Sequence, residues 1–563
     1  MAWYDEAIFY HIYPLGLLGA PRENSYDTVT HRLPELLPWI DHIREIGCNA
    51  LYIGPLFESV GHGYETTDYR KLDSRLGDND DLRSFVKACH EKGVRVIFDG
   101  VFNHTGRDFF AFQDIKANRE GSRYCGWYLN LNFGGNNEYN DGFSYENWGG
   151  FNLLVKLNQR NPEVRDYICD VIRFWVKEFD IDGIRLDAAD VLDFDYMKAL
   201  RATANEVKED FWLMGEVIHG DYTRWVNEGT LHSVTNYHLH KALYSGHNDH
   251  NYFEIAHTVK RLYGMGGNRP DGLKLYNFVD NHDVERIFTK LQNKAHFTPV
   301  HILLYTLPGI PSIYYGSEFA IEGKKEQWSD ASLRPALKLS DFQNALTENP
   351  ATKLIARLGK VRQEINALSY GDYQELLLTN RQYAFSRNLD GKSILIAVNN
   401  DDQDFDASLP ANGAETFIGA LSGEKVHADG GSIHITIREN SGDIWIPAED
   451  DSVKAQESAL EAVTTGTAAE KEALEMPEKA EKTESKNAEP PMETPQNDIN
   501  ESNAPNEPST PKEAKTFEDG VIAGLQEAIL ARMEKNGPVT DQMRRDVLSN
   551  VYHDSLINWI KSF

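Results

Sequence analysis

Acidic side chains stand at the ends of four apolar segments, accompanied by one arginine and two histidines. The four segments are Asp99-Gly100-Val101-Phe102-Asn103-His104, Gly183-Ile184-Arg185-Leu186-Asp187, Gly215-Glu216-Val217 and Phe278-Val279-Asp280-Asn281-His282-Asp283. A single strand-terminal aspartate is often only the N-cap of the next helix, and Arg185 could simply pair with Asp99. The combination favours acid–base or nucleophilic chemistry, because several carboxylates are costly to bury together and a structural role has little use for them.

These segments belong to an alternation of short apolar runs and amphipathic helical stretches that extends to about residue 360. Eight runs are expected to be strands: 8–13, 50–53, 94–98, 183–186, 211–214, 233–235, 275–279 and 311–315. Helical stretches between them include 33–46, 80–92, 162–179 and 196–208. Continuous apolar runs are typical of parallel strands buried on both faces, so the alternation predicts an α/β fold, a (β/α)8 TIM barrel. Such a barrel carries its active site at the C-terminal strand ends, which is where the acids stand.

The four acidic segments resemble the four hallmark regions of glycoside hydrolase family 13, the α-amylase family, and they fall on the expected strands. Gly61-His62-Gly63-Tyr64 and Pro308-Gly309-Ile310-Pro311 support the resemblance, which covers residues 1 to about 447. Val155-Lys156-Leu157-Asn158 is similar to the fifth region of the neopullulanase and cyclomaltodextrinase branch. That region usually begins Met-Pro, where this chain has Leu154-Val155.

The resemblance implies retaining hydrolysis of an α-glycosidic bond through a covalent glycosyl intermediate, which needs two carboxylates roughly 5–5.5 Å apart. It makes Asp187 the nucleophile, Glu216 the general acid/base and Asp283 the third catalytic acid. Arg185, on the same strand face as Asp187, is expected to keep the nucleophile ionised. The implied substrate-binding residues are Tyr64, His104, Arg185, His282, Asp330 and Arg334. Asp99 and Asn103 are expected to give structural support.

Many α-amylases bind a structural calcium ion through the residue matching Asn103 and an acid in the fifth region. Here the second position is Asn158, which lacks the charge that a hard cation prefers. A calcium ion is therefore possible but not predicted, no metal ligands are assigned and no cofactor is required. The N-terminal β-domain usual in the branch is not expected, because the first strand begins at Ile8, and this favours a monomer.

The domain organisation is predicted from changes in residue composition and in hydrophobic periodicity along the chain. The barrel is expected over 1–365, with an inserted subdomain at 105–158 after the third strand, in an interval rich in Gly, Asn, Tyr and Trp. Alternating strands with hairpin turns predict a C-terminal β-sandwich over 366–447. A stretch rich in Glu, Ala, Pro and Thr predicts a disordered acidic linker over 448–516, and amphipathic periodicity predicts a helical tail over 517–563. The tail is a candidate for docking a protein partner or for self-association.

The composition narrows the classes of partner. The formal charge is -30 at pH 7, which disfavours nucleic acid and anionic membrane and suits a neutral substrate. No run approaches the ~20 apolar residues of a membrane span. The N-terminus resembles no signal peptide, and the four cysteines show no ligand spacing, so a cytoplasmic location is expected.

The function that these features favour is cleavage of α-1,4 glucosidic bonds, with some α-1,6 activity, in maltodextrins, cyclodextrins or starch-derived oligosaccharides. One alternative is an α-glucosidase or transglycosylase on short α-glucosides. A further alternative, from another class, is a carbohydrate-binding scaffold with an inactive barrel. Inactive relatives lose one of the three acids, whereas Asp187, Glu216 and Asp283 are all present.

Overall fold

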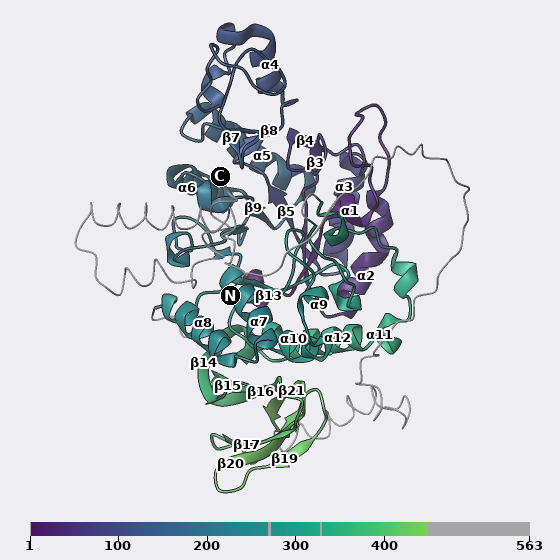
Figure 1. The fold of residues 1–563 in the computed structure, drawn as a ribbon, viewed down its shortest axis with the longest axis vertical. Helices are drawn as coiled ribbons and strands as arrows, with labels where there is room; N and C mark the ends of the chain where they lie inside the picture. The colour runs from purple at the N-terminus through teal and green to yellow at the C-terminus, as the bar shows by residue number, and fades with distance from the viewer. Residues whose placement is uncertain (1, 268–271, 327–328, 449–563) are drawn as a thin grey trace, which may run out of the picture. The chain divides into compact units, whose positions relative to one another are not determined.

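The computed structural model describes residues 2–267, 272–326 and 329–448, and eight parallel strands form the centre of this part (Figure 1). The strands are β1 (Phe9–Ile12), β2 (Ala50–Ile53), β5 (Arg95–Gly100), β9 (Gly183–Leu186), β10 (Trp212–Gly215), β11 (Ser233–Val234), β12 (Tyr276–Phe278) and β13 (Ile310–Tyr314). Their order in the sheet is β11-β10-β9-β5-β2-β1-β13-β12. A parallel bridge between Thr235 and Tyr276 joins the two edges. The TIM-barrel prediction is therefore confirmed.

Thirteen α-helices occur in the described residues, and the longer ones surround the barrel. They are α1 (Pro14–Leu17), α2 (Leu37–Glu45), α3 (Asn79–Glu91), α4 (Phe110–Asn118), α5 (Pro162–Phe179), α6 (Phe194–Val207), α7 (Tyr237–Asn248), α8 (Tyr252–Met265), α9 (Ile287–Lys290), α10 (Phe297–Thr306), α11 (Ala345–Glu348), α12 (Pro350–Glu364) and α13 (Ala367–Tyr370). None of these helices is long and apolar enough to cross a membrane.

Helix α5 shows how the sequence specifies a helix on the barrel wall. Asn161 caps its first turn by accepting a hydrogen bond from the backbone N–H of Glu163, and Pro162 occupies the position where a missing N–H costs least. Its buried side chains recur at helical spacing: Val164, Ile168, Val171, Ile172, Trp175 and Phe179. The ring of Trp175 stacks on Phe57 with centroids 4.4 Å apart, which fixes the helix against the hairpin that follows β2.

The segment after β5 forms the expected insertion. It contains α4 and a small antiparallel sheet of β6 (His104–Thr105), β8 (Phe151–Lys156) and β7 (Asn147–Trp148). A second hairpin, β3 (Phe57–Ser59) with β4 (Thr66–Leu72), follows β2. Figure 1 shows the insertion standing beyond the barrel, on the side away from the C-terminal sheets. The insertion follows β5 directly, and Tyr64, between β3 and β4, donates to Asp99 on β5, so both segments lie next to a strand end that carries an acid.

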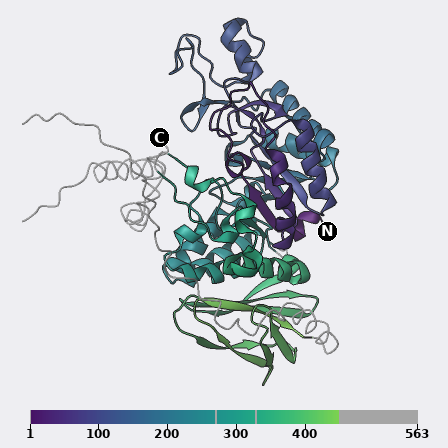
Figure 2. The same ribbon diagram turned by 90° about the vertical axis from the view of Figure 1, so that its right-hand side faces the viewer.

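The C-terminal β-domain consists of two antiparallel sheets. The strands are β14 (Asp372–Leu378), β15 (Gln382–Leu389), β16 (Lys392–Asn399), β17 (Phe405–Pro410), β18 (Thr416–Gly419), β19 (Lys425–His427), β20 (Ser432–Ile437) and β21 (Ser441–Pro447). One sheet has six strands and the other pairs β17 with β20. Their facing side chains, including Leu395, Phe417 and Trp445, form a separate apolar core. Helices α7, α8, α10 and α12 lie between these sheets and the barrel (Figures 1 and 2). The predicted linker and helical tail lie outside the described residues, apart from Ala448.

Candidate active site

Parallel register brings the acidic strand ends together. Asp99 on β5 lies opposite Arg185 on β9. The backbone N–H of Asp187, just past β9, donates to Gly100 O at 3.1 Å, and that of Glu216, just past β10, donates to Leu186 O at 2.9 Å. Three neighbouring strands therefore end with polar side chains at one level of the barrel mouth, as the sequence pattern predicts.

Arg185 is the centre of this cluster. Its Nη1 lies 2.7 Å from Asp99 Oδ1 and 2.9 Å from Asp187 Oδ1, while its Nη2 lies 2.9 Å from Glu216 Oε2. The arginine is 3 % exposed, and the surrounding carboxylates raise its pKa well above the ordinary value despite burial. One buried, permanently charged guanidinium thus holds three carboxyl groups.

The carboxyl group of Asp187 is nearly inaccessible to solvent. Burial raises its pKa well above the ordinary value; the charge of Arg185 opposes this rise, whereas the charges of Glu216, Asp99 and Asp283 add to it. Like charges this close cannot all ionise as easily as isolated groups. The protonation of Asp187 is therefore coupled to its acidic neighbours, which is a property expected of a site for acid–base chemistry.

A strained turn after Asp187 aims a backbone donor at Glu216. Ala188 has a left-handed backbone (φ +46°), which is uncommon for a residue other than glycine, and its N–H donates to Glu216 Oε2 at 3.1 Å. A side chain at Gly215 would place its Cβ 2.4 Å from Leu231 Cδ1 and 2.7 Å from Ala189. The residue before Glu216 thus has to be small for the two strand ends to approach this closely.

Asp283, in the loop after β12, is held on two sides by His282 and Arg334. His282 Nε2 lies 3.0 Å from its Oδ2, and Arg334 Nη2 lies 2.9 Å from its Oδ1. Burial acts against ionisation, but His282, Arg334 and Arg185 together hold the pKa of Asp283 well below its usual range. The same Arg334 Nη2 lies 2.7 Å from Asp330 Oδ2, so this arginine links the two aspartates.

Tyr64 contacts both Asp99, on β5, and His282, in the loop after β12. Its hydroxyl donates to Asp99 Oδ2 at 3.1 Å and lies 2.5 Å from His282 Nε2, and its ring stacks on that of His282 with centroids 5.8 Å apart. Tyr52, which the sequence argument missed, also donates to Asp99 Oδ2, at 2.9 Å. Strand alternation could have found it, because Tyr52 points to the inner face of the barrel like its partner His11 on β1.

His104 and Asn103 form a tight internal network beside the inserted subdomain. His104 Nε2 donates to the carbonyl of Tyr64 at 3.1 Å, and its Nδ1 lies 3.2 Å from Asn103 Nδ2. Burial lowers the pKa of His104 to about 4, so the ring is neutral at pH 7. Asn103 Oδ1 in turn accepts from Gln159 Nε2 at 3.1 Å. Both ring nitrogens of His104 thus have protein partners, and its contact with a sugar stays a prediction.

The sequence pattern described as "Alpha amylase, catalytic domain" matches residues 35–353, which is more than half of the chain. The chain belongs to the α-amylase family. The pattern described as "Alpha-amylase C-terminal domain" matches residues 371–445. Relatives of this chain are named cyclomaltodextrinase, neopullulanase and maltogenic α-amylase, and these are glycoside hydrolases. The chain is therefore an enzyme of that class.

Curated relatives cover most of this α-amylase-family chain. A cyclomaltodextrinase of Thermoanaerobacter pseudethanolicus is 31 % identical over 429 residues, 71 % of this chain and 71 % of the relative. Neopullulanase 2 of Thermoactinomyces vulgaris is 29 % identical over 476 residues, 78 % of this chain and 77 % of the relative. A solved cyclomaltodextrinase structure superposes with a TM-score of 0.69 at 25 % identity, covering 79 % and 78 % of the two chains.

The two positions that match the calcium site of many α-amylases both carry amide side chains in this chain, Asn103 and Asn158. Asn103 Oδ1 already accepts from Gln159, and Asn158 presents an amide whose Nδ2 donates to Gly126 O at 3.0 Å. Neither position supplies a carboxylate, so neither side chain brings a negative charge to balance a calcium ion, and a calcium ion is not predicted here. No catalytic step in this enzyme is assigned to calcium.

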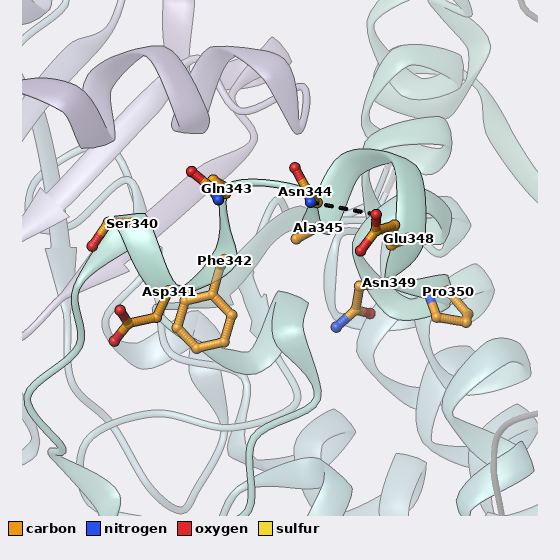
Figure 3. A pocket seen from close by; sticks show the side chains of 9 residues that line it. All are labelled: Ser340, Asp341, Phe342, Gln343, Asn344, Ala345, Glu348, Asn349 and Pro350. Carbon is orange, nitrogen blue, oxygen red and sulfur yellow. Dashed lines mark hydrogen bonds between the residues drawn. The ribbon is translucent and has the colours of Figure 1, made fainter.

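Two adjoining hollows, which share residues 340–343 and Ala345, are lined by residues outside the predicted site. The larger, of about 960 Å³, is lined by α2 and by residues 336–346, and the smaller, of about 450 Å³, by residues 340–350. Figure 3 shows the smaller one, where Asn344 Nδ2 donates to Glu348 Oε1 at 3.3 Å. None of the predicted site residues lines either hollow, so the candidate active site remains the strand-end cluster.

Proposed function

We propose that this enzyme is a retaining α-glycoside hydrolase acting on maltodextrins, cyclodextrins or starch-derived oligosaccharides. The observation that carries the proposal is the guanidinium of Arg185, which contacts Asp187 and Glu216 at 2.9 Å each. Two carboxyl groups joined by one cation are close enough to act on opposite ends of one glycosidic bond. The names of the relatives, cyclomaltodextrinase and neopullulanase, support α-1,4 and α-1,6 linked glucans as the substrate class.

In the first step Asp187 attacks the anomeric carbon while Glu216 protonates the glycosidic oxygen, and the bond to the leaving sugar breaks. In the second step Glu216 takes a proton from water, the water oxygen attacks the same carbon, and Asp187 leaves as a carboxylate. Glu216 Oε2 accepts from Arg185 and from Ala188 N, so we assign the proton transfers to Oε1. Arg185 compensates the negative charge of Asp187 before attack and after release.

Asp283 is assigned to the hydroxyl groups of the reacting sugar. Its ionised form, maintained by His282 and Arg334, is suited to accept hydrogen bonds and to stabilise positive charge that develops on the ring. His282, His104 and Tyr64 are proposed to contact the same sugar, and Asp330 with Arg334 the next one. No metal or organic cofactor takes part in this mechanism. A cytoplasmic location is part of the proposal and is consistent with four cysteines that are all free thiols.

Stereochemistry tests the mechanism independently of substrate preference. Proton NMR during early turnover of maltotriose should show the α-anomer of the product first, because two displacements at one carbon restore its configuration. If the β-anomer appears first, Asp187 is not a covalent nucleophile. Comparison of products from maltotriose, pullulan and β-cyclodextrin then defines bond preference. Longer products than the substrate would identify the transglycosylase alternative.

A further inference from the structure

One aromatic ring of the inserted subdomain is exposed without packing on an apolar core. The exposed large apolar side chains of the insertion are Phe110, Tyr139 and Phe151, at 44 %, 45 % and 65 %. The ring of Phe110 packs on Tyr124 with centroids 5.4 Å apart. The guanidinium of Arg107 lies over the ring of Tyr139, 3.8 Å from its centroid. Phe151, in contrast, belongs to none of the apolar clusters of the described residues.

A second aromatic residue stands opposite Phe151 at the tip of the hairpin formed by β7 and β8. Phe151 pairs with Trp148, which also belongs to none of the apolar clusters in the described part of the chain. Gly149 and Gly150 make the turn, and both have positive φ, +62° and +82°, as a two-residue type I′ turn requires. Opposite residues of an antiparallel pair share one face of the hairpin. A single exposed ring is common on protein surfaces, but two at one tight tip indicate a binding surface.

The polar side chains beside this tip are amides or are paired with a neighbour. Asn147 Nδ2 donates to Asn152 Oδ1 at 2.8 Å, and Asn152 Nδ2 donates to Glu138 Oε2 at 2.8 Å. At the other end of β8, Lys156 Nζ lies 3.0 Å from Glu146 Oε1. The negative faces of aromatic rings attract the C–H faces of a sugar, and amides both donate to and accept from hydroxyl groups. The composition of the tip therefore suits a neutral polyhydroxylated chain.

Strand β8 connects the tip to the candidate active site. Its last residue, Lys156, pairs with His104 on β6, and His104 Nε2 donates to the carbonyl of Tyr64. The six residues of β8 place Phe151 about 17 Å from that pair at the rise of an extended strand. Figure 1 shows β7 and β8 between α4 and the barrel. A glucan that leaves the site along β8 therefore reaches the tip only after several sugar units, and maltotriose is too short to occupy both places.

We propose that the hairpin tip formed by Trp148 and Phe151 is a distal binding site for the α-glucan substrate, which makes this enzyme prefer long maltodextrins to short ones. The two rings hold sugar units that are remote from the bond being cut, and this binding adds to that of the residues at the strand ends. The inference rests on the proposed function, because it extends the substrate of the same site.

The exposure of Phe151 allows a matched set of variants. Phe151→Ala removes the ring and Phe151→Tyr keeps one. Phe253→Ala is the control, because Phe253 on α8 is 48 % exposed and lies outside the insertion. Values of kcat/KM on maltotriose and on a long linear maltodextrin are measured for each, together with Tm and light scattering. The Kd of the long maltodextrin is measured for each in the Asp187→Asn background, in which turnover is removed.

We expect Phe151→Ala to lose about fivefold or more in kcat/KM on the long maltodextrin and to raise its Kd by a similar factor. On maltotriose the same variant should stay within about twofold of wild type, and Phe151→Tyr and Phe253→Ala should match wild type on both substrates.

The inference is overturned if Phe151→Ala lowers kcat/KM equally on both substrates or on neither, or if wild type does not prefer the long chain. A lower mass by light scattering for Phe151→Ala, with unchanged kcat/KM, would show that the tip is a contact between copies of the chain instead. A wild-type enzyme inactive on every α-glucan would refute the proposed function, whereas the comparison of Kd values would still decide whether the tip binds glucan.

Discussion

Arg185 Nη2 lies 2.9 Å from Glu216 Oε2, so the proposed acid/base is joined to the same cation as the proposed nucleophile. Because Nη1 of the arginine contacts Asp187 and Asp99, a change at any one carboxyl group alters the charge felt by the others. The ionisation of Asp187 therefore depends on the charges of the acidic groups around it. This coupling shapes three of the expectations that follow.

Removal of either proposed catalytic carboxylate should abolish turnover. Asp187→Asn and Glu216→Gln keep size and hydrogen-bonding capacity but lose nucleophilic or proton-transfer function, which removes on the order of 10³-fold or more in kcat. Asp341→Asn and Glu348→Gln, at exposed residues that line the smaller hollow, are matched controls and should retain wild-type rates. Retention of a tenth of wild-type activity by either site variant on every α-glucan tested would refute the assigned roles.

Asp187→Asn should also be more stable than wild type at neutral pH. Burial raises the pKa of Asp187, so its ionised form is disfavoured in the folded state, and wild-type stability is lost as pH rises through that raised pKa. The variant has no such group to ionise. Thermal denaturation between pH 4 and pH 8 should show the Tm advantage of Asp187→Asn growing with pH. An advantage that is constant or shrinks with pH would contradict the assigned direction.

Arg185→Lys should move the acid limb of kcat/KM toward higher pH. The guanidinium opposes the rise in the pKa of Asp187, and one ammonium group cannot match its forked contacts to three carboxyl groups. Since the nucleophile must be ionised, activity would be lost at a pH about one unit or more higher than in wild type. Arg173→Lys is the control, because Arg173 pairs with Asp170 and Glu206 on the surface. An unchanged acid limb would show that another group sets it.

Truncation after Pro447 should leave an active enzyme. Strand β21 ends at that residue, and every proposed site residue precedes it. We propose that residues 517–563 dock a partner or self-associate and are dispensable for catalysis. The truncated chain should match wild type in kcat/KM and Tm on maltotriose, and light scattering should report any change in association state. An unstable or inactive truncation would show that the tail belongs to the catalytic fold.

The sequence by itself determined the barrel and the position of its acids. Apolar runs and helical periodicity depend only on residues close together in the sequence. The eight barrel strands therefore occur where the eight apolar runs, beginning with those at Ile8 and Ala50, predicted them. The polar residue that ends a buried strand is equally visible, which is why Asp187, Glu216 and Asp283 could be named from sequence. Their grouping followed from the general rule that parallel strand ends meet at one face.

Only the tertiary structure decided which groups these acids contact. Closure of the barrel adds Glu216 to the carboxyl groups around Arg185 and brings Arg334 to Asp283, and neither contact follows from spacing along the chain. The left-handed turn at Ala188 and the edge-to-face contact of His11 with His282 depend on packing between strands that are far apart in sequence. Local patterns encode which face a side chain occupies, whereas its hydrogen-bond partners depend on how the elements pack, because those bonds form across elements rather than within them.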